Sequence, residues 1–433
     1  MNKTLFQPSD LYRIPWTLPD NGISWLEPTS KCNLSCYGCY RKNVSAHKTL
    51  EQVKHEIDVV QRLRKTDCIS IAGGDPLLYP HIIDMVAEIK SRGIKPIVNT
   101  NGIALTKELL SELKNAGVYG FTFHVDSKQK REGWTGKTEL ELNELRYHFA
   151  KMLAEEGGIA CSFNATVYAD TMKYIPEMVK WAQNNIDIVN TIVFILFRYV
   201  TPGIGYDFYA GAKKVVNEDI HYHSDKDEIT NIMAPDIVNL IRTTEPEFFP
   251  AAYLNGTHKA DSYKWLLTER MGTKDKIFTY VDSKFMELIM AGYHYLFGTY
   301  ISYGSPKTIN KGRTTMVLLW PLNKSVRRAF KRYLGYVLRN PLRIFKKVYM
   351  QSVLIIQPVD VMADGEQNMC DGCPDITVWK DPNGVDQLVW SCRLEEPMQY
   401  GRFLRTVPKE EFPDTVDSAV TKDAISKAAV SNN

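Results

Sequence analysis

The sequence predicts an α/β fold in which parallel strands and crossover helices alternate over the first two hundred residues. Six apolar runs typical of buried strands follow one another between residues 23 and 199. Each run except the last is followed by apolar residues at helical spacing. Such alternation favours a parallel sheet, and six units suit a partial barrel as well as a doubly wound sheet. In both architectures the loops after the strands carry the functional site.

The expected elements follow in a regular order. The predicted strands are residues 23–26, 68–72, 95–100, 121–126, 159–168 and 188–199. Thr49 and Gln52 form a capping-box pair before the first helix, Pro80 opens the second, and Gly117 ends the third. Two further helices are indicated by apolar residues at helical spacing, namely Leu142, Leu145, Phe149 and Leu153, then Ile175, Val179 and Ala182.

The alternation stops after residue 200, which predicts the domain organisation. Residues 1–200 are expected to form the α/β core domain. Residues 201–356 form a mixed, largely helical region with a basic amphipathic segment, and residues 357–405 form a subdomain with cysteines. Small, polar and charged residues dominate 406–433, which we expect to be a flexible tail.

Composition restricts the class of protein. The 433 residues are 44% hydrophobic and 24% charged, which excludes a disordered chain or a small disulfide scaffold. A net charge of +3 indicates no general polyanion partner. Residues 1–18 lack the apolar core of a signal peptide, and no uncharged apolar stretch of about 18 residues occurs. We therefore expect a cytoplasmic protein whose eight cysteines serve metal binding or chemistry.

Three cysteines follow the first predicted strand. Cys32, Cys36 and Cys39 have C-x3-C-x2-C spacing, so their thiolates can surround one metal centre. Zinc normally takes a fourth protein ligand, and none is close in sequence. A four-iron cluster held by three cysteines instead leaves one iron open for a cofactor or substrate. A zinc loop or unrelated surface thiols are the alternatives.

This segment resembles the radical S-adenosylmethionine (SAM) superfamily over residues 20–200. The cysteine spacing is that family's signature, and residues 72–76 (AGGDP) are similar to its glycine-rich motif. The resemblance implies a partial (β/α)6 barrel, a [4Fe-4S] cluster on Cys32, Cys36 and Cys39, and bound S-adenosylmethionine. It also implies cleavage of that cofactor to a 5′-deoxyadenosyl radical that abstracts a substrate hydrogen, with an electron donor such as flavodoxin or ferredoxin.

The sequence departs from the family pattern at two positions. Gly38 stands where the family usually has an aromatic residue that touches the adenine, with Tyr37 and Tyr40 on either side. Asp75 stands where the glycine-rich motif more often ends in Glu.

Polar residues at predicted strand ends complete the expected cofactor site. The expected cofactor-binding residues are Tyr37, Tyr40, Gly73, Gly74, Asp75, Asn101, Asp126, Ser127, Asn164 and Arg198. His124 is interpreted either as a proton donor or as a packed core histidine. His221 and His223 are interpreted as part of a solvated loop, and Cys68 and Cys161 as small buried hydrophobic residues.

A second group of cysteines lies near the C-terminus. Cys370 and Cys373 form a C-x2-C pair, and a hairpin around residues 382–384 is expected to return Cys392 to their side. The group predicts an auxiliary iron–sulfur cluster, a zinc site with a remote ligand such as Asp371 or a histidine, or a disulfide. The cytoplasmic expectation disfavours the disulfide.

The sequence is compatible with two classes of function. The first is a radical SAM enzyme acting on RNA, a peptide or a small or lipid-linked substrate, and the second is a non-catalytic iron–sulfur electron carrier. A carrier needs no cofactor pocket, so the glycine-rich motif favours the enzyme.

A basic segment near residue 335 provides a prediction about where in the cell the protein acts. Nine Lys and Arg residues and no acid occur in residues 324–347, interleaved with leucines and aromatics. Contact with the cytoplasmic face of a membrane is favoured over RNA binding, with a plain solvated face as the alternative. Membrane contact would suit a hydrophobic substrate, and Pro341 predicts two helical pieces rather than one.

Overall fold

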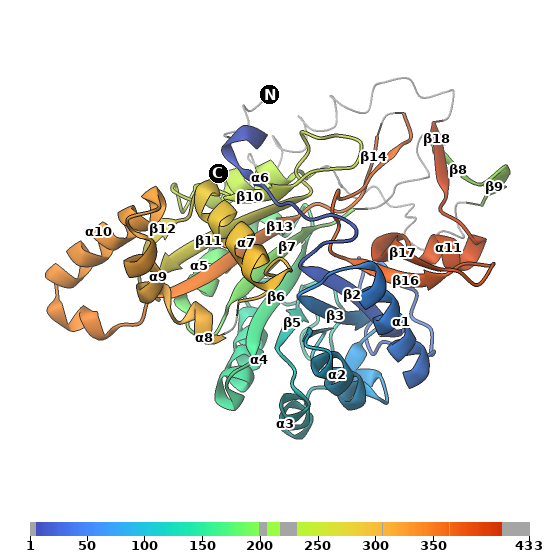
Figure 1. The fold of residues 1–433 in the computed structure, drawn as a ribbon, viewed down its shortest axis with the longest axis horizontal. Helices are drawn as coiled ribbons and strands as arrows, with labels where there is room; N and C mark the ends of the chain where they lie inside the picture. Colours follow the sequence, from blue (N-terminus) through green and yellow to red (C-terminus); the bar gives the residue numbers. More distant parts are fainter. Residues whose placement is uncertain (1–5, 199–205, 217–231, 305, 363, 409–433) are drawn as a thin grey trace.

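A large, mainly parallel β-sheet runs through the molecule (Figure 1). The computed structural model describes residues 6–198, 206–216, 232–304, 306–362 and 364–408. The strand order is β1-β10-β11-β13-β7-β6-β5-β4-β3-β2, and β12 pairs with β11 beside this path. Within the described residues β1 and β2 are the two ends of the order, so the strands form an open sheet rather than a closed barrel. The α/β prediction is confirmed.

The six predicted strands are present and adjacent. They are β2 Ile23–Thr29, β3 Cys68–Gly73, β4 Lys95–Thr100, β5 Gly120–His124, β6 Ala160–Val167 and β7 Thr191–Leu196. Each pairs in parallel with the next. Their carboxyl ends therefore meet at one edge of the sheet, as a site built from strand-end residues requires.

Five helices connect these strands. They are α1 Leu50–Leu63, α2 Ile82–Ser91, α3 Lys107–Ala116, α4 Asn143–Glu156 and α5 Ile175–Asn184. The Thr49–Gln52 capping box is formed, and Gly117 ends α3 in the left-handed conformation with φ of 98°. The apolar faces of the five helices pack on the sheet in one continuous core, which includes Val53, Met85, Leu113, Phe149 and Val179.

The chain beyond residue 200 also builds the sheet. It contributes β10 Ala252–Leu254, β11 Trp265–Gly272, β12 Ile277–Tyr280 and β13 Tyr349–Ile356, while the short β1 Tyr12–Arg13 pairs with β10. β13 lies parallel to β7, and β11 runs antiparallel to its neighbours. The expected boundary at residue 200 thus does not coincide with an edge of the sheet, because backbone hydrogen bonds continue from β7 to β13.

Helices of this second part cover a different core. They are α6 Ala234–Arg242, α7 Ser283–Phe297, α8 Pro306–Ile309, α9 Gly312–Leu319 and α10 Lys324–Leu338. Residues of α7, α9 and α10 pack with Trp16, Met271 and Phe278. α10 ends at Leu338, and the 3-10 turn η5 Pro341–Phe345 follows, as the proline predicted. None of the helices in the described ranges has the length and apolar character needed to cross a bilayer.

The C-terminal segment forms small antiparallel units (Figure 1). The predicted hairpin is present as β16 Ile376–Lys380 and β17 Asp386–Trp390. The remaining elements are β14 Asp360–Val361, β15 Gln367–Asn368, α11 Glu395–Tyr400, and a sheet of β18 Arg405–Pro408, β8 Tyr206–Ala210 and β9 Lys213–Val215. The expected tail from residue 406 thus begins inside β18; residues 409–433, together with His221 and His223, lie outside the described residues.

A buried polar network joins the two parts of the sheet. Arg270 of β11 donates to Gln351 Oε1 of β13 at 2.6 and 2.9 Å and to the Val179 carbonyl of α5 at 2.8 Å. Gln351 in turn donates to the Ala182 and Val189 carbonyls at 2.8 and 2.7 Å. Both side chains are fully buried, so β11 and β13 are fixed to α5 through groups that water cannot replace.

We expect Arg270→Ala to lower the free energy of unfolding by about 3–5 kcal/mol, because it leaves buried carbonyls and Gln351 without their donor. Urea denaturation followed by circular dichroism measures the change. Lys151→Ala, which removes a Lys of an exposed pair on α4, is the matched control and should cost less than about 0.5 kcal/mol. Equal effects of the two substitutions would contradict a structural role for the network.

Candidate functional site

The loop after β2 holds the first three cysteines at the carboxyl edge of the sheet. The Asn43 side chain closes this loop, since its Oδ1 accepts from the Cys32 amide at 2.9 Å and its Nδ2 donates to the Cys32 carbonyl at 3.0 Å. Sulfur atoms also accept backbone hydrogen bonds, Cys32 from Leu34 and Cys39 from Arg41, both at 3.4 Å. The loop therefore has a defined backbone that presents three free thiols.

The three thiols are close enough to influence one another. Burial raises the pKa of the Cys36 thiol, and the charges of Asp126, then Cys39 and Cys32, raise it further. Within the described residues no three His, Cys, Asp or Glu side chains converge tightly enough to bind a single metal ion. The electrostatic effect of Cys39 and Cys32 on Cys36 nevertheless places the three thiols near one another, as ligands of one shared metal centre must be.

Gly73 and Gly74 lie directly against the cysteine loop. A Cβ at Gly74 would lie 2.1 Å from the Lys31 carbonyl oxygen, and one at Gly73, where φ is 104°, would lie 2.3 Å from that of Thr29. The Gly74 amide donates to the Thr29 carbonyl at 2.8 Å. Glycine is required at both positions because the motif and the cysteine loop touch backbone to backbone.

Asp75 has a positioning role in this arrangement. Its buried carboxylate accepts from the Thr100 hydroxyl at 2.8 Å, the Asn101 amide at 2.8 Å and the Leu77 amide at 3.0 Å. Burial raises its pKa despite these bonds. The carboxylate predicted to contact cofactor is thus engaged by protein donors, which tie the glycine motif to the end of β4.

Arg131 is a charged neighbour of the thiols that sequence reasoning missed. It is only 6% exposed, its guanidinium donates to the Asn101 carbonyl at 2.8 Å, and its Nε has no hydrogen-bond partner among the described residues. Burial lowers the pKa of Arg131, and Cys36 has the largest electrostatic effect in the opposite direction. A buried cation with an unused donor beside thiols suits an anionic group. No local pattern around residue 131 distinguishes it from its neighbours Lys128 and Lys130.

Asn101 and the end of β5 supply further polar groups. Asn101 Nδ2 lies 3.8 Å from Cys32 Sγ and 2.7 Å from Asn33 Oδ1. His124 Nε2 lies 2.8 Å from Asp126 Oδ2 and 3.0 Å from the Thr166 hydroxyl.

Two effects on Asp126 oppose each other. Burial acts to raise the pKa of Asp126, but the bond and charge of His124 outweigh it, and the pKa falls below its usual value. Asp126 is thus an ionised, buried acid paired with a half-buried histidine.

Ser127 and Asn164 flank this pair. The Ser127 amide donates to Glu139 at 2.7 Å, and Asn164 faces His124 in the register of β6 with β5. The Asn164 side chain is half-buried and makes no side-chain hydrogen bond within the described residues. It is therefore available to a ligand.

The rings of Tyr168 and Phe197 fill the space that a side chain at position 38 would need. A Cβ at Gly38 would lie 2.7 Å from the Tyr168 hydroxyl and 3.0 Å from Phe197. Tyr37 packs beside these two rings, with centroids 5.8 and 5.7 Å away. Tyr40 instead lies under Arg41, whose guanidinium carbon is 4.9 Å from its ring centroid. Tyr37, rather than Tyr40, therefore belongs to the aromatic surface at the strand ends.

The Arg198 side chain is hydrogen-bonded to other residues of the protein. Its Nε donates to Asp360 of β14 at 2.8 Å, and it also binds the Ile232 carbonyl. Lys264 binds the same carboxylate at 2.5 Å. The predicted ligand-binding arginine thus fixes β14 to the end of β7.

The second cysteine group is assembled as the hairpin predicted. A hydrogen bond with Cys370 and burial raise the pKa of Cys373 well above its usual value. Burial, reinforced by Cys370, raises the pKa of Cys392 to about 12. None of the eight cysteines forms a disulfide. Asp371, one suggested zinc ligand, instead pairs with Arg13 at 2.9 Å.

A buried ion pair connects the two cysteine groups. Arg41, two residues after Cys39, forms a bidentate pair with Glu27 of β2, both bonds being 2.7 Å. Its guanidinium also donates to the Ser391 carbonyl at 2.7 Å, next to Cys392. One side chain thus holds the first cysteine loop, β2 and the C-terminal hairpin together.

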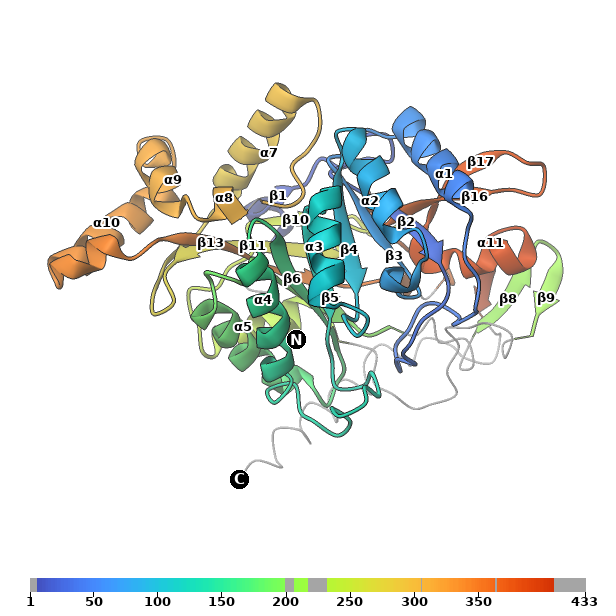
Figure 2. The ribbon, with the colours of Figure 1, turned by 90° about the horizontal axis from the view of Figure 1, so that it is seen from below.

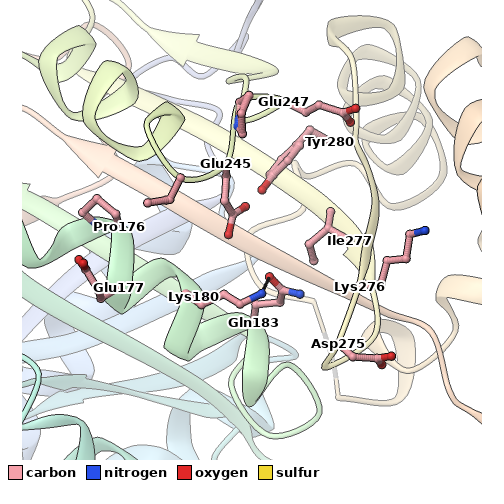
Figure 3. A pocket seen from close by; sticks show the side chains of 12 residues that line it. Pro176, Glu177, Lys180, Gln183, Glu245, Glu247, Asp275, Lys276, Ile277 and Tyr280 are labelled. Carbon is pink, nitrogen blue, oxygen red and sulfur yellow. Dashed lines mark hydrogen bonds between the residues drawn. The ribbon is translucent and has the colours of Figure 1, made fainter.

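A pocket also lies away from the thiols. A cavity of about 540 Å³ opens between α5, the residues after α6, and β12 (Figure 3). Glu245, Tyr280 and Lys180 point into it from three different segments. It contains no cysteine and no residue predicted for the cofactor, so it does not bear on the chemistry of the thiols.

Comparisons with known proteins match the region of the first cysteine loop. The family model described as the radical SAM superfamily matches residues 26–182. The chain is 32% identical to an AdoMet-dependent heme synthase of Methanosarcina barkeri, over 24% of this chain and 30% of that protein. It is 25% identical to a probable GTP 3′,8-cyclase of Methanocaldococcus jannaschii, over 51% of this chain and 73% of that one.

A solved structure is similar over a comparable part. SuiB of Streptococcus suis, bound to its precursor peptide SuiA, has a TM-score of 0.33 and 17% identity, covering 42% of this chain and 41% of SuiB. The chain spans about a third of the length of the heme synthase that it matches.

We expect Gly74→Ala to displace the cysteine loop, because the new Cβ meets the Lys31 carbonyl. The purified variant should stay folded but hold less than about half the wild-type iron after anaerobic reconstitution with iron and sulfide, as measured by metal analysis. Gly292→Ala, at a helix position with nothing within 4 Å, is the control and should keep wild-type iron. Unchanged iron in the Gly74 variant would contradict the close packing.

Proposed function

Because residues 26–182 form a radical SAM domain, we propose that this protein is an enzyme that cleaves S-adenosylmethionine at a [4Fe-4S] cluster. The observation that carries the proposal is the meeting of Cys32, Cys36 and Cys39 with the Gly73–Gly74 backbone at the carboxyl edge of a parallel sheet. When bound, the cluster and the cofactor supply an electron transfer that yields a 5′-deoxyadenosyl radical able to abstract a substrate hydrogen.

The residues present fit these groups. Three thiols with no disulfide offer the ligands of a cluster. Arg131 supplies a buried positive charge with a free Nε donor beside Cys36. That donor suits the carboxylate of the cofactor or the negative charge of the cluster.

Individual residues take distinct roles in this proposal. The Gly73–Gly74 backbone orients the cofactor amino group, and Tyr37 with Tyr168 and Phe197 offers an apolar surface to the adenine. Asp126, Ser127 and Asn164 lie where ribose hydroxyls need acceptors and donors.

Asp75 and Arg198 act as positioning residues in this scheme. Their charged groups are bound by protein partners on β4 and β14. Tyr40 supports Arg41 rather than the cofactor.

We also propose an auxiliary iron–sulfur cluster on Cys370, Cys373 and Cys392. Their mutual closeness and burial support it, as does the Arg41 bridge that places this group beside the first loop. Asp375, whose pKa burial raises to about 7, and Arg64, which donates to the Cys373 carbonyl at 2.8 Å, line the same region.

The proposed reaction indicates the chemical class of the substrate and of the electron-donating partner. A low-potential electron donor such as flavodoxin or ferredoxin is needed to reduce the cluster. Eight free cysteines suit a reducing compartment such as the cytoplasm. The substrate is a molecule with an abstractable hydrogen, and the candidate classes are a small molecule, a peptide, RNA and a lipid-linked compound. Transfer of deuterium from a deuterated candidate substrate into 5′-deoxyadenosine tests each of them.

We expect the triple variant Cys32→Ala, Cys36→Ala, Cys39→Ala to lose about four irons per chain and all release of 5′-deoxyadenosine under reducing, anaerobic conditions. The reason is that these thiolates are the cluster ligands. Cys68→Ala and Cys161→Ala, which change buried strand cysteines, are the controls and should retain iron and cofactor cleavage. Persistent cleavage by the triple variant would overturn the assignment, and wild-type protein that binds iron but never cleaves the cofactor would favour an electron carrier.

In the same triple variant, we expect reconstitution to leave iron and sulfide on the C-terminal group, because Cys370, Cys373 and Cys392 are unaltered. Changing these three to Ser as well should remove the remaining iron. Metal analysis and electron paramagnetic resonance after reduction measure both steps. One zinc per chain and no iron in the triple variant would show that the C-terminal site is structural.

A further inference from the structure

A ridge of exposed apolar and basic side chains projects from one end of the molecule. It consists of residues 317–347 on α9, α10 and η5, and we call it the basic ridge (Figures 1 and 2). Its outermost apolar side chains include Leu322, Leu338 and Phe345, which are 71%, 82% and 81% exposed. Leu318 and Leu342 are exposed by 66% and 74%. Soluble surfaces rarely expose so many large apolar groups together.

These side chains are not the unused face of an amphipathic helix. The apolar face of α10 is packed inside the protein, where Val326, Ala329, Tyr333 and Tyr336 are buried. The rings of Tyr333 and Tyr336 stand edge-on to Phe278 of β12, at 5.7 and 5.4 Å. The exposed leucines and Phe345 are therefore additional to what the fold needs.

The charges on the ridge have one sign. Lys324, Lys331, Arg339 and Lys347 are exposed and form no ion pair within the described residues; Arg328 is also exposed and forms no ion pair there, but it lies near enough to Glu247 to help lower the pKa of that acid. Only Arg332, paired with Glu247, and Lys346, 3.3 Å from Asp275, are neutralised. The surface thus combines apolar side chains with unpaired positive charge.

We propose that the basic ridge lies on the surface of an anionic lipid bilayer. Leucine and phenylalanine side chains would enter the interface while lysine and arginine contact lipid phosphates. RNA is a poorer match, because both tyrosines of the ridge are buried against β12, which leaves Trp320 and Phe345 as its exposed aromatic side chains. A second copy of the chain is disfavoured because two ridges would bring like charges together.

The proposal also fixes an orientation. η5 leads into the first residues of β13, whereas the cysteine loop leaves the last residue of β2, and both strands point the same way in one sheet. The views agree, with α10 at one extreme of the molecule and α11 near the other (Figures 1 and 2). A ridge resting on lipid therefore holds the thiols away from the bilayer. This orientation removes the reason to infer a lipid substrate from membrane contact.

Co-sedimentation with vesicles tests the proposal with the full-length protein. We expect binding to phosphatidylcholine vesicles containing phosphatidylserine at low salt, weaker binding at high salt, and little binding to phosphatidylcholine alone. Lys324→Gln, Arg328→Gln, Lys331→Gln and Arg339→Gln together should weaken binding several hundredfold, at about fivefold per charge. Leu322→Ser, Leu338→Ser, Leu342→Ser and Phe345→Ser together should abolish the binding that remains at high salt.

A matched control removes four exposed lysines elsewhere: Lys107→Gln, Lys137→Gln, Lys151→Gln and Lys173→Gln. It should bind vesicles within about threefold of the wild type, because membrane attraction acts locally. Circular dichroism confirms folding of every variant. Absence of binding to anionic vesicles at low salt, or an equal loss in the control, would overturn the proposal. So would displacement of the protein from vesicles by a short RNA that binds the ridge more tightly than lipid does.

Discussion

The buried pair between Glu27 and Arg41 is the constraint on which the site depends. Glu27 of β2 supplies the carboxylate, Arg41 supplies the guanidinium from the end of the cysteine loop, and the Nη2 atom that binds Glu27 also donates to the Ser391 carbonyl. Pairs of this kind add little net stability, because desolvation offsets attraction, but a missing partner leaves an uncompensated buried charge. The pair therefore acts mainly by fixing one arrangement of three segments, of which two lie 14 residues apart and the third lies 350 residues from Arg41 in the chain.

This constraint explains why the two cysteine groups form one region. The amide of Arg41 donates to Cys39 Sγ, while its guanidinium reaches the residue before Cys392. Val378 of the hairpin also packs on Val59 and Val60 of α1, which adds an apolar contact between the C-terminal hairpin and the first helix.

Sequence patterns within a few residues were enough to predict the elements that are determined locally. The strands, the Thr49 capping box, the Gly117 stop and the C-terminal hairpin all follow from spacing within a few residues, and the structure has them. β13 was not predicted, although its run of Val353 to Ile356 is apolar, because its partners β7 and β11 lie far away in sequence. The protein partners of the site side chains were not predicted for the same reason: Thr100 binds Asp75, and Asp360 binds Arg198, from distant segments. Arg131 carries no sequence signal at all.

The position of β13 has a consequence for how the chain reaches its native state. β7 ends at Leu196, and its neighbour β13 begins at Tyr349, after a long detour through α6 to α10. Pairing across such a separation requires the closure of a large loop, which slows folding and raises contact order. During synthesis, β2 to β7 and their helices are made first. The edge of β7 that pairs with β13 therefore has no partner strand until β13 is made. An unpaired edge of this kind is prone to wrong pairing until β13 has been synthesised and covers it.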